Sequence, residues 1–124
     1  MLEHRWAAEI GNVDVLKLLI QNGADVNAVQ KNKSLHIAIR NGQTDFAKVL
    51  IQNGADVNAV AYEKKTALHF AAQNKRSNSV TMLIRNGADV NAVDYKKSTA
   101  LHFAAQNNYF DFVTMLIRNG ADVN

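Results

Sequence analysis

Three histidines recur at one position of a repeating pattern, and histidine is the commonest protein ligand of metal ions. They are His36, His69 and His102, each preceded by leucine, while His4 stands apart near the N-terminus. Equivalent positions in successive stacked units lie roughly 8–10 Å apart, whereas zinc needs its nitrogen ligands at about 2.0–2.1 Å. We therefore expect these histidines to form no metal site, and we expect no cofactor.

Aspartate also recurs once per repeat, at Asp25, Asp56, Asp89 and Asp122. Two carboxylates that act as general acid and base face each other within about 5–9.5 Å, in different environments. The recurrent aspartates stand at equivalent positions of successive units and so have similar surroundings. They do not meet this requirement for an acid–base pair. The chain also lacks cysteine, a Gly-rich phosphate loop, Gly-x-Ser-x-Gly and His-Glu-x-x-His. We expect that it is not an enzyme.

These residues belong to a repeat that organises the whole chain. The hexapeptide Asn-Gly-Ala-Asp-Val-Asn begins at Asn22, Asn53, Asn86 and Asn119, so its spacings are 31, 33 and 33 residues. A period in this range is typical of a solenoid of stacked supersecondary units. Each copy follows an apolar run, and its glycine accepts the left-handed backbone that ends helices. The segment is predicted to be a helix end followed by a reversal.

Each repeat is predicted to contain two helices. Residues 66–74 and 99–107 are identical, and Thr66 and Thr99 are suited to cap the first helix of their repeats. Thr44 and Asp45 are predicted to cap the second helix of the second repeat. The second helices carry amphipathic apolar stripes. Such a helix pair cannot bury its apolar stripe alone, so stability must come from stacking.

The chain resembles the ankyrin repeat family through Thr-Ala-Leu-His followed by Ala-Ala, and through Gly-Ala-Asp-Val-Asn. The resemblance covers a single domain, residues 1–124, with a truncated repeat at about 1–26 and full repeats at about 27–57, 58–90 and 91–124. It implies an all-α solenoid of paired antiparallel helices, with short β-hairpin-like fingers and a concave binding surface. It also implies that the recurrent histidine makes structural hydrogen bonds.

Several positions depart from the family pattern. Lys64 and Lys97 replace the finger-tip glycine, and Lys75 and Asn108 replace the glycine between paired helices. Residues with a Cβ tolerate a left-handed backbone less well than glycine does. The second repeat is two residues shorter in its finger region, and we still expect a finger there. Ser79 occupies a second-helix position that is apolar in the other repeats, which predicts a weak point in the core.

The resemblance implies partner contacts at the fingers and on the exposed side of the first helices. Tyr62 and Tyr95 lie in the fingers, where no core role explains them. The lysines are expected to form a row along the fingers, although a solvated loop explains lysines alone equally well. The candidate partner-binding residues are Lys31, Lys33, Arg40, Asn41, Tyr62, Glu63, Lys65, Gln73, Asn74, Tyr95, Lys96, Ser98, Gln106 and Asn107.

Asn58 and Asn91 are candidates for hydroxylation. Each lies eight residues after a leucine, which is similar to the pattern that asparaginyl hydroxylases accept in ankyrin repeats. The simpler interpretation is that these asparagines hydrogen-bond the turn.

Composition and charge limit the classes of partner and the cellular locations that we expect. A formal charge of +3 and a pI of about 9.3 permit an acidic protein partner. Nucleic acid is not expected, because there is no long basic run and only two aromatics are placed to stack on bases. The chain has no run of about 18 apolar residues and no signal-peptide pattern, so we expect no membrane association. Absence of cysteine fits a cytoplasmic, intracellular location.

The favoured function is protein–protein recognition through the concave surface. The alternative is a structural fragment of a longer array, or an engineered repeat scaffold, with no partner of its own. Near-identity of the third and fourth repeats and the lack of a polar capping repeat favour that alternative. The uncovered apolar side of the last helix pair further predicts weak self-association.

Overall fold

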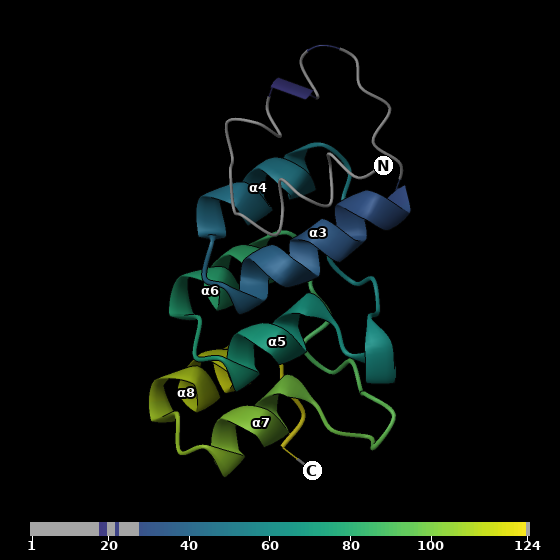
Figure 1. The fold of residues 1–124 in the computed structure, drawn as a ribbon. Coiled ribbons are helices and arrows are strands. Elements are labelled where there is room, and N and C mark those ends of the chain that lie inside the picture. Colours follow the sequence, from purple (N-terminus) through teal and green to yellow (C-terminus); the bar gives the residue numbers. More distant parts are fainter. Residues whose placement is uncertain (1–17, 20–21, 23–27, 124) are drawn as a thin grey trace.

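The computed structural model describes residues 18, 19, 22 and 28–123, and this part of the chain is built of helices joined by short loops (Figure 1). In chain order they are α3 (Ala28–Arg40), α4 (Thr44–Gln52), the 3-10 turn η1 (Tyr62–Lys64), α5 (Ala67–Gln73), α6 (Ser77–Arg85), α7 (Ala100–Gln106) and α8 (Phe110–Arg118). No strand is formed by the described residues, so the all-α prediction is confirmed. The expected first, truncated repeat lies almost entirely outside them.

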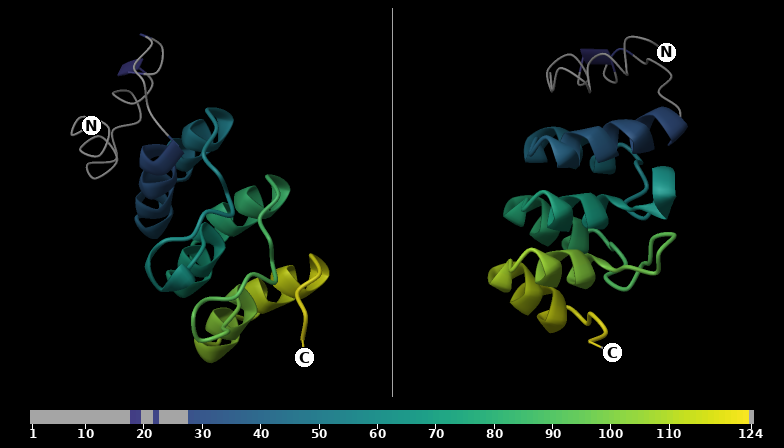
Figure 2. Two further views of the ribbon diagram at one scale, coloured as in Figure 1. Left: turned by 90° about the vertical axis from the view of Figure 1, so that its right-hand side faces the viewer. Right: turned by 60° about the horizontal axis from the view of Figure 1, so that its bottom comes forward.

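The helices form pairs that stack along one axis (Figures 1 and 2). The pairs are α3 with α4, α5 with α6, and α7 with α8, which form the second, third and fourth repeats. The first helices make one row, because α5 packs against both α3 and α7. Among the second helices, α4 packs against α6. The Thr81 hydroxyl donates a hydrogen bond of 3.5 Å to the Met115 sulfur and so joins α6 to α8.

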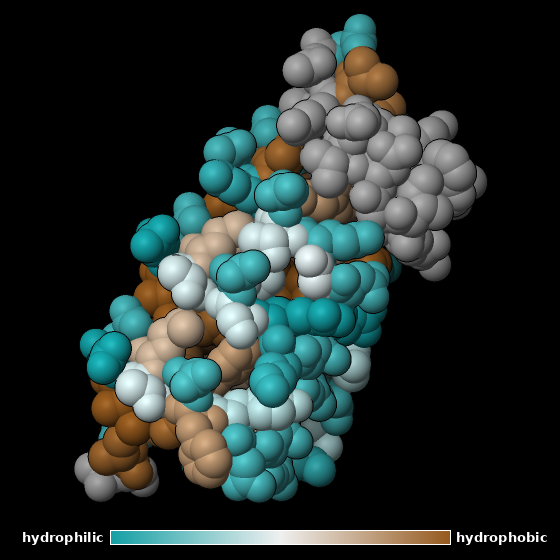
Figure 3. All heavy atoms as spheres, turned by 90° about the vertical axis from the view of Figure 1, so that its left-hand side faces the viewer, coloured by the Kyte–Doolittle hydropathy of each residue, from teal (hydrophilic) through white to brown (hydrophobic). Residues whose placement is uncertain are grey.

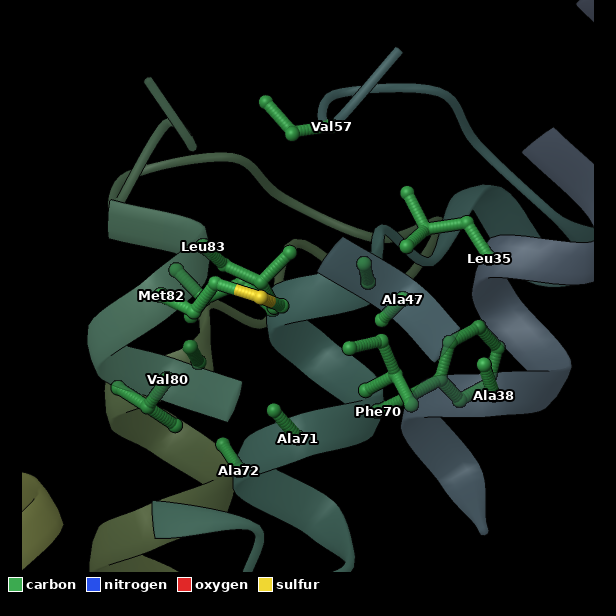
Figure 4. Packing of buried hydrophobic residues seen from close by; sticks show 14 of the residues in the cluster. Leu35, Ala38, Ala47, Val57, Phe70, Ala71, Ala72, Val80, Met82 and Leu83 are labelled. Carbon is green, nitrogen blue, oxygen red and sulfur yellow. The ribbon is translucent and has the colours of Figure 1, made fainter. Parts of the chain in front are cut away.

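The core lies between these layers and is continuous from α3 to α8. Figure 4 shows side chains from α3, α4, α5 and α6 meeting there, with Phe70 and the small Ala71 and Ala72 contributed by α5. Alanine on the facing sides lets neighbouring helices approach closely. Each repeat thus buries its apolar face against the next one, as the stacking argument requires.

Asparagine ends the helices, as the recurrent Asn-Gly predicts. The Asn53 side-chain amide donates to the Val49 carbonyl at 2.8 Å, and the following Gly54 has a φ of 99°. This arrangement satisfies a carbonyl that the helix end would leave without a partner. The same four-residue contact is made by Asn22, Asn74, Asn86, Asn107 and Asn119.

The prediction that Thr44 and Asp45 cap α4 is wrong. Thr44 is the first residue of the helix, and the flanking Gln43 makes no capping hydrogen bond with its side chain. The Thr44 hydroxyl instead lies 3.3 Å from the hydroxyl of Ser79 on α6. Threonine here joins two repeats, which a local capping rule could not anticipate.

The finger expected in the second repeat is also absent. Residues 28–34, which would have formed it, are the first turns of the continuous helix α3. The segment is two residues shorter than the fingers of the third and fourth repeats. The backbone hydrogen bonds are satisfied by helix instead. Lys31 and Lys33 therefore lie on a helix and not in a finger.

Lysine and asparagine do adopt the left-handed backbone where the family pattern has glycine. The φ angles are 59° at Lys64, 64° at Lys97, 55° at Lys75 and 60° at Asn108, beside 73° at Gly42. These four positions therefore keep the left-handed backbone that glycine has in the family pattern. Each stores a small strain, because a Cβ disfavours this conformation.

Candidate protein-binding surface

Two fingers project from the stack, one of residues 59–66 and one of residues 92–99. In the first, the Ala61 amide donates to the Lys65 carbonyl at 2.7 Å, and in the second the Asp94 amide donates to the Ser98 carbonyl at 3.0 Å. The Tyr95 amide also donates to the Glu63 carbonyl at 3.0 Å. The two fingers are thereby held side by side.

Asp94 shapes the second finger and was missed in the sequence. Its carboxylate is buried and accepts from the amides of Lys96 at 2.9 Å and Ser98 at 2.8 Å. The equivalent residue of the first finger is Ala61, and that turn uses two left-handed residues, Glu63 and Lys64. An aspartate that begins a turn is a recognised signal for this motif, so the sequence did carry the information.

Tyr62 and Tyr95 point outward, as expected. Their side chains are 61% and 53% exposed. The Tyr62 ring lies 6.0 Å from the Phe70 ring, and the Lys96 ammonium lies 5.6 Å from the Tyr95 ring. These contacts orient the two aromatic rings while leaving most of their area open to a partner.

Lys65 does not belong to the exposed surface, so its assignment as a partner-binding residue is wrong. It is buried, 9% exposed, with its ammonium 3.4 Å from the carboxylate of Glu63. The same ammonium lies 5.8 Å from the Tyr62 ring and 5.5 Å from the Phe103 ring. The aliphatic stem packs under the finger, as long basic side chains often do, and Lys65 is a structural residue.

The polar candidates divide into free and engaged groups. Gln73, Gln106 and Asn41 are exposed. Asn74 and Asn107 are exposed as well, but their amides already cap α5 and α7. The half-buried Ser98 uses its backbone carbonyl to accept a hydrogen bond from His69 at 2.9 Å. These last three have structural roles that do not require a partner.

Lysines lie along the fingers of the third and fourth repeats, where Lys64, Lys96 and Lys97 are exposed, but in the second repeat the basic residues lie on a helix. Lys31, Lys33 and Arg40 lie on α3, with Lys33 and Arg40 exposed. The Arg40 guanidinium lies 5.6 Å from the ring of Phe70. The positive charge of this region therefore lies along a helix, beside the first finger.

The recurrent histidines make the expected structural hydrogen bonds. His69 Nδ1 accepts from the Thr66 amide at 3.0 Å while Nε2 donates to the Ser98 carbonyl, so one imidazole caps α5 and holds the next finger. His36 Nε2 donates to the Ala59 carbonyl at 2.9 Å. Burial lowers the pKa of both His36 and His69, because the apolar surroundings disfavour the charged imidazolium.

Asn58 and Asn91 link successive reversals of the chain. Asn58 Oδ1 accepts from the Asp89 amide at 2.7 Å, and its Nδ2 donates to the Gly87 carbonyl at 3.0 Å. Asn91 makes the same pair of bonds, to the Asp122 amide at 2.7 Å and the Gly120 carbonyl at 3.2 Å. In the second repeat Asn32 of α3 accepts from the Asp56 amide at 2.7 Å. Each asparagine bonds residues 24 to 31 positions further along the chain, in the reversal that ends its own repeat, which is more than the expected local turn.

The family comparison agrees with this geometry. A family described as ankyrin repeats, in three copies, matches residues 4–61 and 58–124. The chain belongs to the ankyrin repeat family. A comparison with curated proteins finds no match.

Ankyrin repeats are generally protein–protein interaction modules and typically have no enzymatic activity. Within residues 28–123 and the three described before them, no group of three or more His, Cys, Asp or Glu side chains could hold a metal ion. Over the same residues no helix is both long and apolar enough to cross a membrane.

Proposed function

We propose that this ankyrin repeat chain binds a protein partner through the two fingers and the exposed faces of α3, α5 and α7. The observation that carries the proposal is the exposure of Tyr62 and Tyr95 on fingers that are themselves fixed by backbone hydrogen bonds. Tyrosine offers a large contact area at little cost in side-chain entropy and is enriched at interface hot spots. Preorganised aromatic rings are what a recognition surface needs.

The partner is proposed to be acidic. The surface carries Lys33, Arg40 and Lys96, all exposed, and the formal net charge of the chain is +3. Such charges mainly speed encounter and make association sensitive to salt. The absence of cysteine is consistent with a protein of a reducing compartment. We propose that the chain is located in the cytoplasm.

A pull-down from cell lysate with two alanine variants tests the proposal. Tyr62→Ala with Tyr95→Ala should weaken binding of the recovered partner by about 2 kcal/mol or more. The control variant replaces Lys48, Arg85 and Arg118, which are exposed on the second helices, and should bind normally. Circular dichroism must show both variants folded, since Tyr62 also contacts Phe70. A partner lost with the control set and kept with the tyrosine pair would overturn the assignment, and no partner at all would favour a purely structural fragment or scaffold.

We also propose that Asn58 or Asn91 is accessible to an asparaginyl hydroxylase. Both side chains are exposed, although both amides are engaged in two hydrogen bonds. The enzyme would have to open the reversal before it reacts. Mass spectrometry after incubation should find one added oxygen on an internal site, and its absence from both would reject the idea.

A further inference from the structure

A groove of about 500 Å³ runs between α3 and the first finger. We call it the α3 groove. One wall is a helical stripe that includes Lys33, Ile37 and Arg40, and the other is the finger segment with Val60 and Tyr62. Its volume lies in the range of ordinary ligand pockets. In the right-hand view of Figure 2 the teal turn η1, which lies within this finger, is next to one end of α3.

The groove exists because the second repeat has no finger. Between the third and fourth repeats, the two fingers lie together through the bond from the Tyr95 amide to the Glu63 carbonyl. Among the described residues the first finger has no such neighbour on its other side, because Ala28–Arg40 is one helix. No finger of the described chain therefore fills the space on that side. This is a property of the shortened second repeat, since the third and fourth repeats lack the deletion.

The walls of the groove combine apolar surface with positive charge. Val60 is 61% exposed, and Val29 near the start of α3 is 73% exposed. Lys33 and Arg40 are exposed and line the groove, and among the described residues no Asp or Glu lines it. The nearby carboxylate of Glu63 is paired with Lys65. An occupant that matches these walls needs a large apolar side chain and flanking negative charge.

His36 adds a directional group to the groove. Its Nε2 donates to the Ala59 carbonyl, because a carbonyl oxygen only accepts, so Nδ1 of the neutral ring is an acceptor. In His69 and His102 the same nitrogen accepts from a threonine amide. Among the described residues His36 Nδ1 has no such donor, since Lys33 stands at the threonine position inside α3. A donor from an occupant could meet it.

We propose that the α3 groove binds an acidic peptide segment of the partner protein. A large apolar side chain of the segment enters between Ile37, Val60 and Tyr62, and the neighbouring carboxylates pair with Lys33 and Arg40. An N–H group of the segment donates to His36 Nδ1. The inference rests on the proposed protein-binding function and gives that function a specific anchor point.

The test uses the full chain and synthetic peptide pools. One pool has Trp, Phe or Leu flanked by Asp and Glu, a second has the same centre flanked by Lys and Arg, and a third has a central Ala with acidic flanks. NMR titration should shift the methyl signals of Ile37 and Val60 with the first pool only. Binding of that pool should weaken several-fold between 50 and 300 mM salt, because the charges at the rim are screened.

The variant pair Val60→Glu and Val93→Glu isolates the groove. Val93 stands at the equivalent position of the second finger, is 49% exposed and does not line the α3 groove, so the same substitution is made outside the groove. Val60→Glu should weaken binding of the acidic pool at least tenfold, and Val93→Glu less than threefold. Lys33→Glu reverses a charge of the groove and removes no apolar contact, so it should also weaken binding about tenfold. It keeps the proposal testable if Val60→Glu does not fold.

Several results would overturn the groove assignment while leaving the protein-binding proposal intact. These are equal losses with Val60→Glu and Val93→Glu, binding of the first pool without shifts at Ile37 and Val60, and preference for the basic pool or for a DNA duplex. Methyl contacts from residues 1–17 in the free chain would show that the chain fills its own groove, which would also overturn it. If Tyr62→Ala with Tyr95→Ala does not weaken binding of the lysate partner, the wider surface of fingers and first helices is rejected. That outcome is separate from the groove experiment.

Discussion

His36 and His69 each donate a ring N–H to a backbone carbonyl of the following finger. Nδ1 of His69 also accepts from the Thr66 amide, which requires the neutral ring. Burial is the largest cause that lowers their pKa below 6.5. For His69 the nearby Asp94 opposes this effect, and for His36 the charge of Arg40 adds to it. The unfolded chain therefore binds more protons than the folded chain just below pH 6.5.

Stability should consequently fall as the pH falls. The contribution of these histidines is fully present above pH 6.5, and it is lost progressively as the pH drops toward their lowered folded-state pKa. Urea unfolding between pH 7.5 and 5.5 should show a decreasing free energy of unfolding. His36→Gln and His69→Gln should each reduce the slope. A free energy that does not change over this range would contradict the prediction.

Lys97 is held in the left-handed region at a φ of 64°, and within the described residues its amide donates to the Asp94 carbonyl at 3.0 Å while its side chain makes no hydrogen bond or ion pair. Lys97→Gly should stabilise the chain by about 0.5–1 kcal/mol, because glycine avoids the Cβ clash although it loses more entropy on folding. The control is Lys48→Gly, on an exposed position within α4. It should destabilise by about 1 kcal/mol. Thermal and urea unfolding that give the same sign for both variants would refute the backbone argument.

At the scale of elements, α4 and α6 meet through a buried polar contact. Ser79 is 1% exposed, which confirms that its position faces the core, and its hydroxyl lies 3.3 Å from that of Thr44. A cleft of about 330 Å³ lies beside both residues. The missing apolar contact predicted for the third repeat is therefore partly offset by a hydrogen bond.

The contact predicts different outcomes for single and double variants. Ser79→Val alone should change stability little, because about 1 kcal/mol from apolar burial is offset by a lost hydrogen bond of similar size. Ser79→Val with Thr44→Val should stabilise by about 1 kcal/mol, since replacing both partners leaves no unpaired hydroxyl. Urea unfolding of the four chains in a double-mutant cycle measures the difference. A double variant less stable than wild type would show that the hydroxyl pair is worth more than the apolar area.

At the scale of the whole molecule, apolar surface gathers at the C-terminal end of the stack. Figure 3, which shows the side away from the fingers, is hydrophilic over much of its area, with hydrophobic atoms toward that end. Phe110 is 74% exposed, Val123 66% and Ile117 46%. Contiguous exposed apolar surface tends to find a partner. Another copy of the chain is the partner present in a purified sample.

A chain of these 124 residues should therefore associate weakly with itself. Sedimentation equilibrium from micromolar to millimolar concentration should show a rising average mass. Phe110→Ser with Ile117→Ser should abolish the rise. Val60→Ser, at a 61% exposed position on a finger, should leave it unchanged. A monomer over the whole concentration range would contradict this prediction.

The sequence by itself determined the repeat, the helix pairs and the C-terminal ends of the helices. These features depend on contacts within a few residues, such as the asparagine that bonds the carbonyl four positions back or the Thr66–His69 capping pair. The same local rules located the positions of left-handed backbone. Equivalent residues recur at a fixed spacing, so the residues that make each local interaction are found several times in the sequence.

Tertiary structure decided what happens where the repeat is broken. Two missing residues did not by themselves say whether the second repeat keeps a short finger or becomes helix, and α3 shows the helix. Burial of Lys65 depends on a ring from the next repeat, and the partner of Thr44 lies on α6. The α3 groove lies between elements of two repeats. Such contacts join residues that are far apart along the chain, and no single stretch of sequence contains both sides.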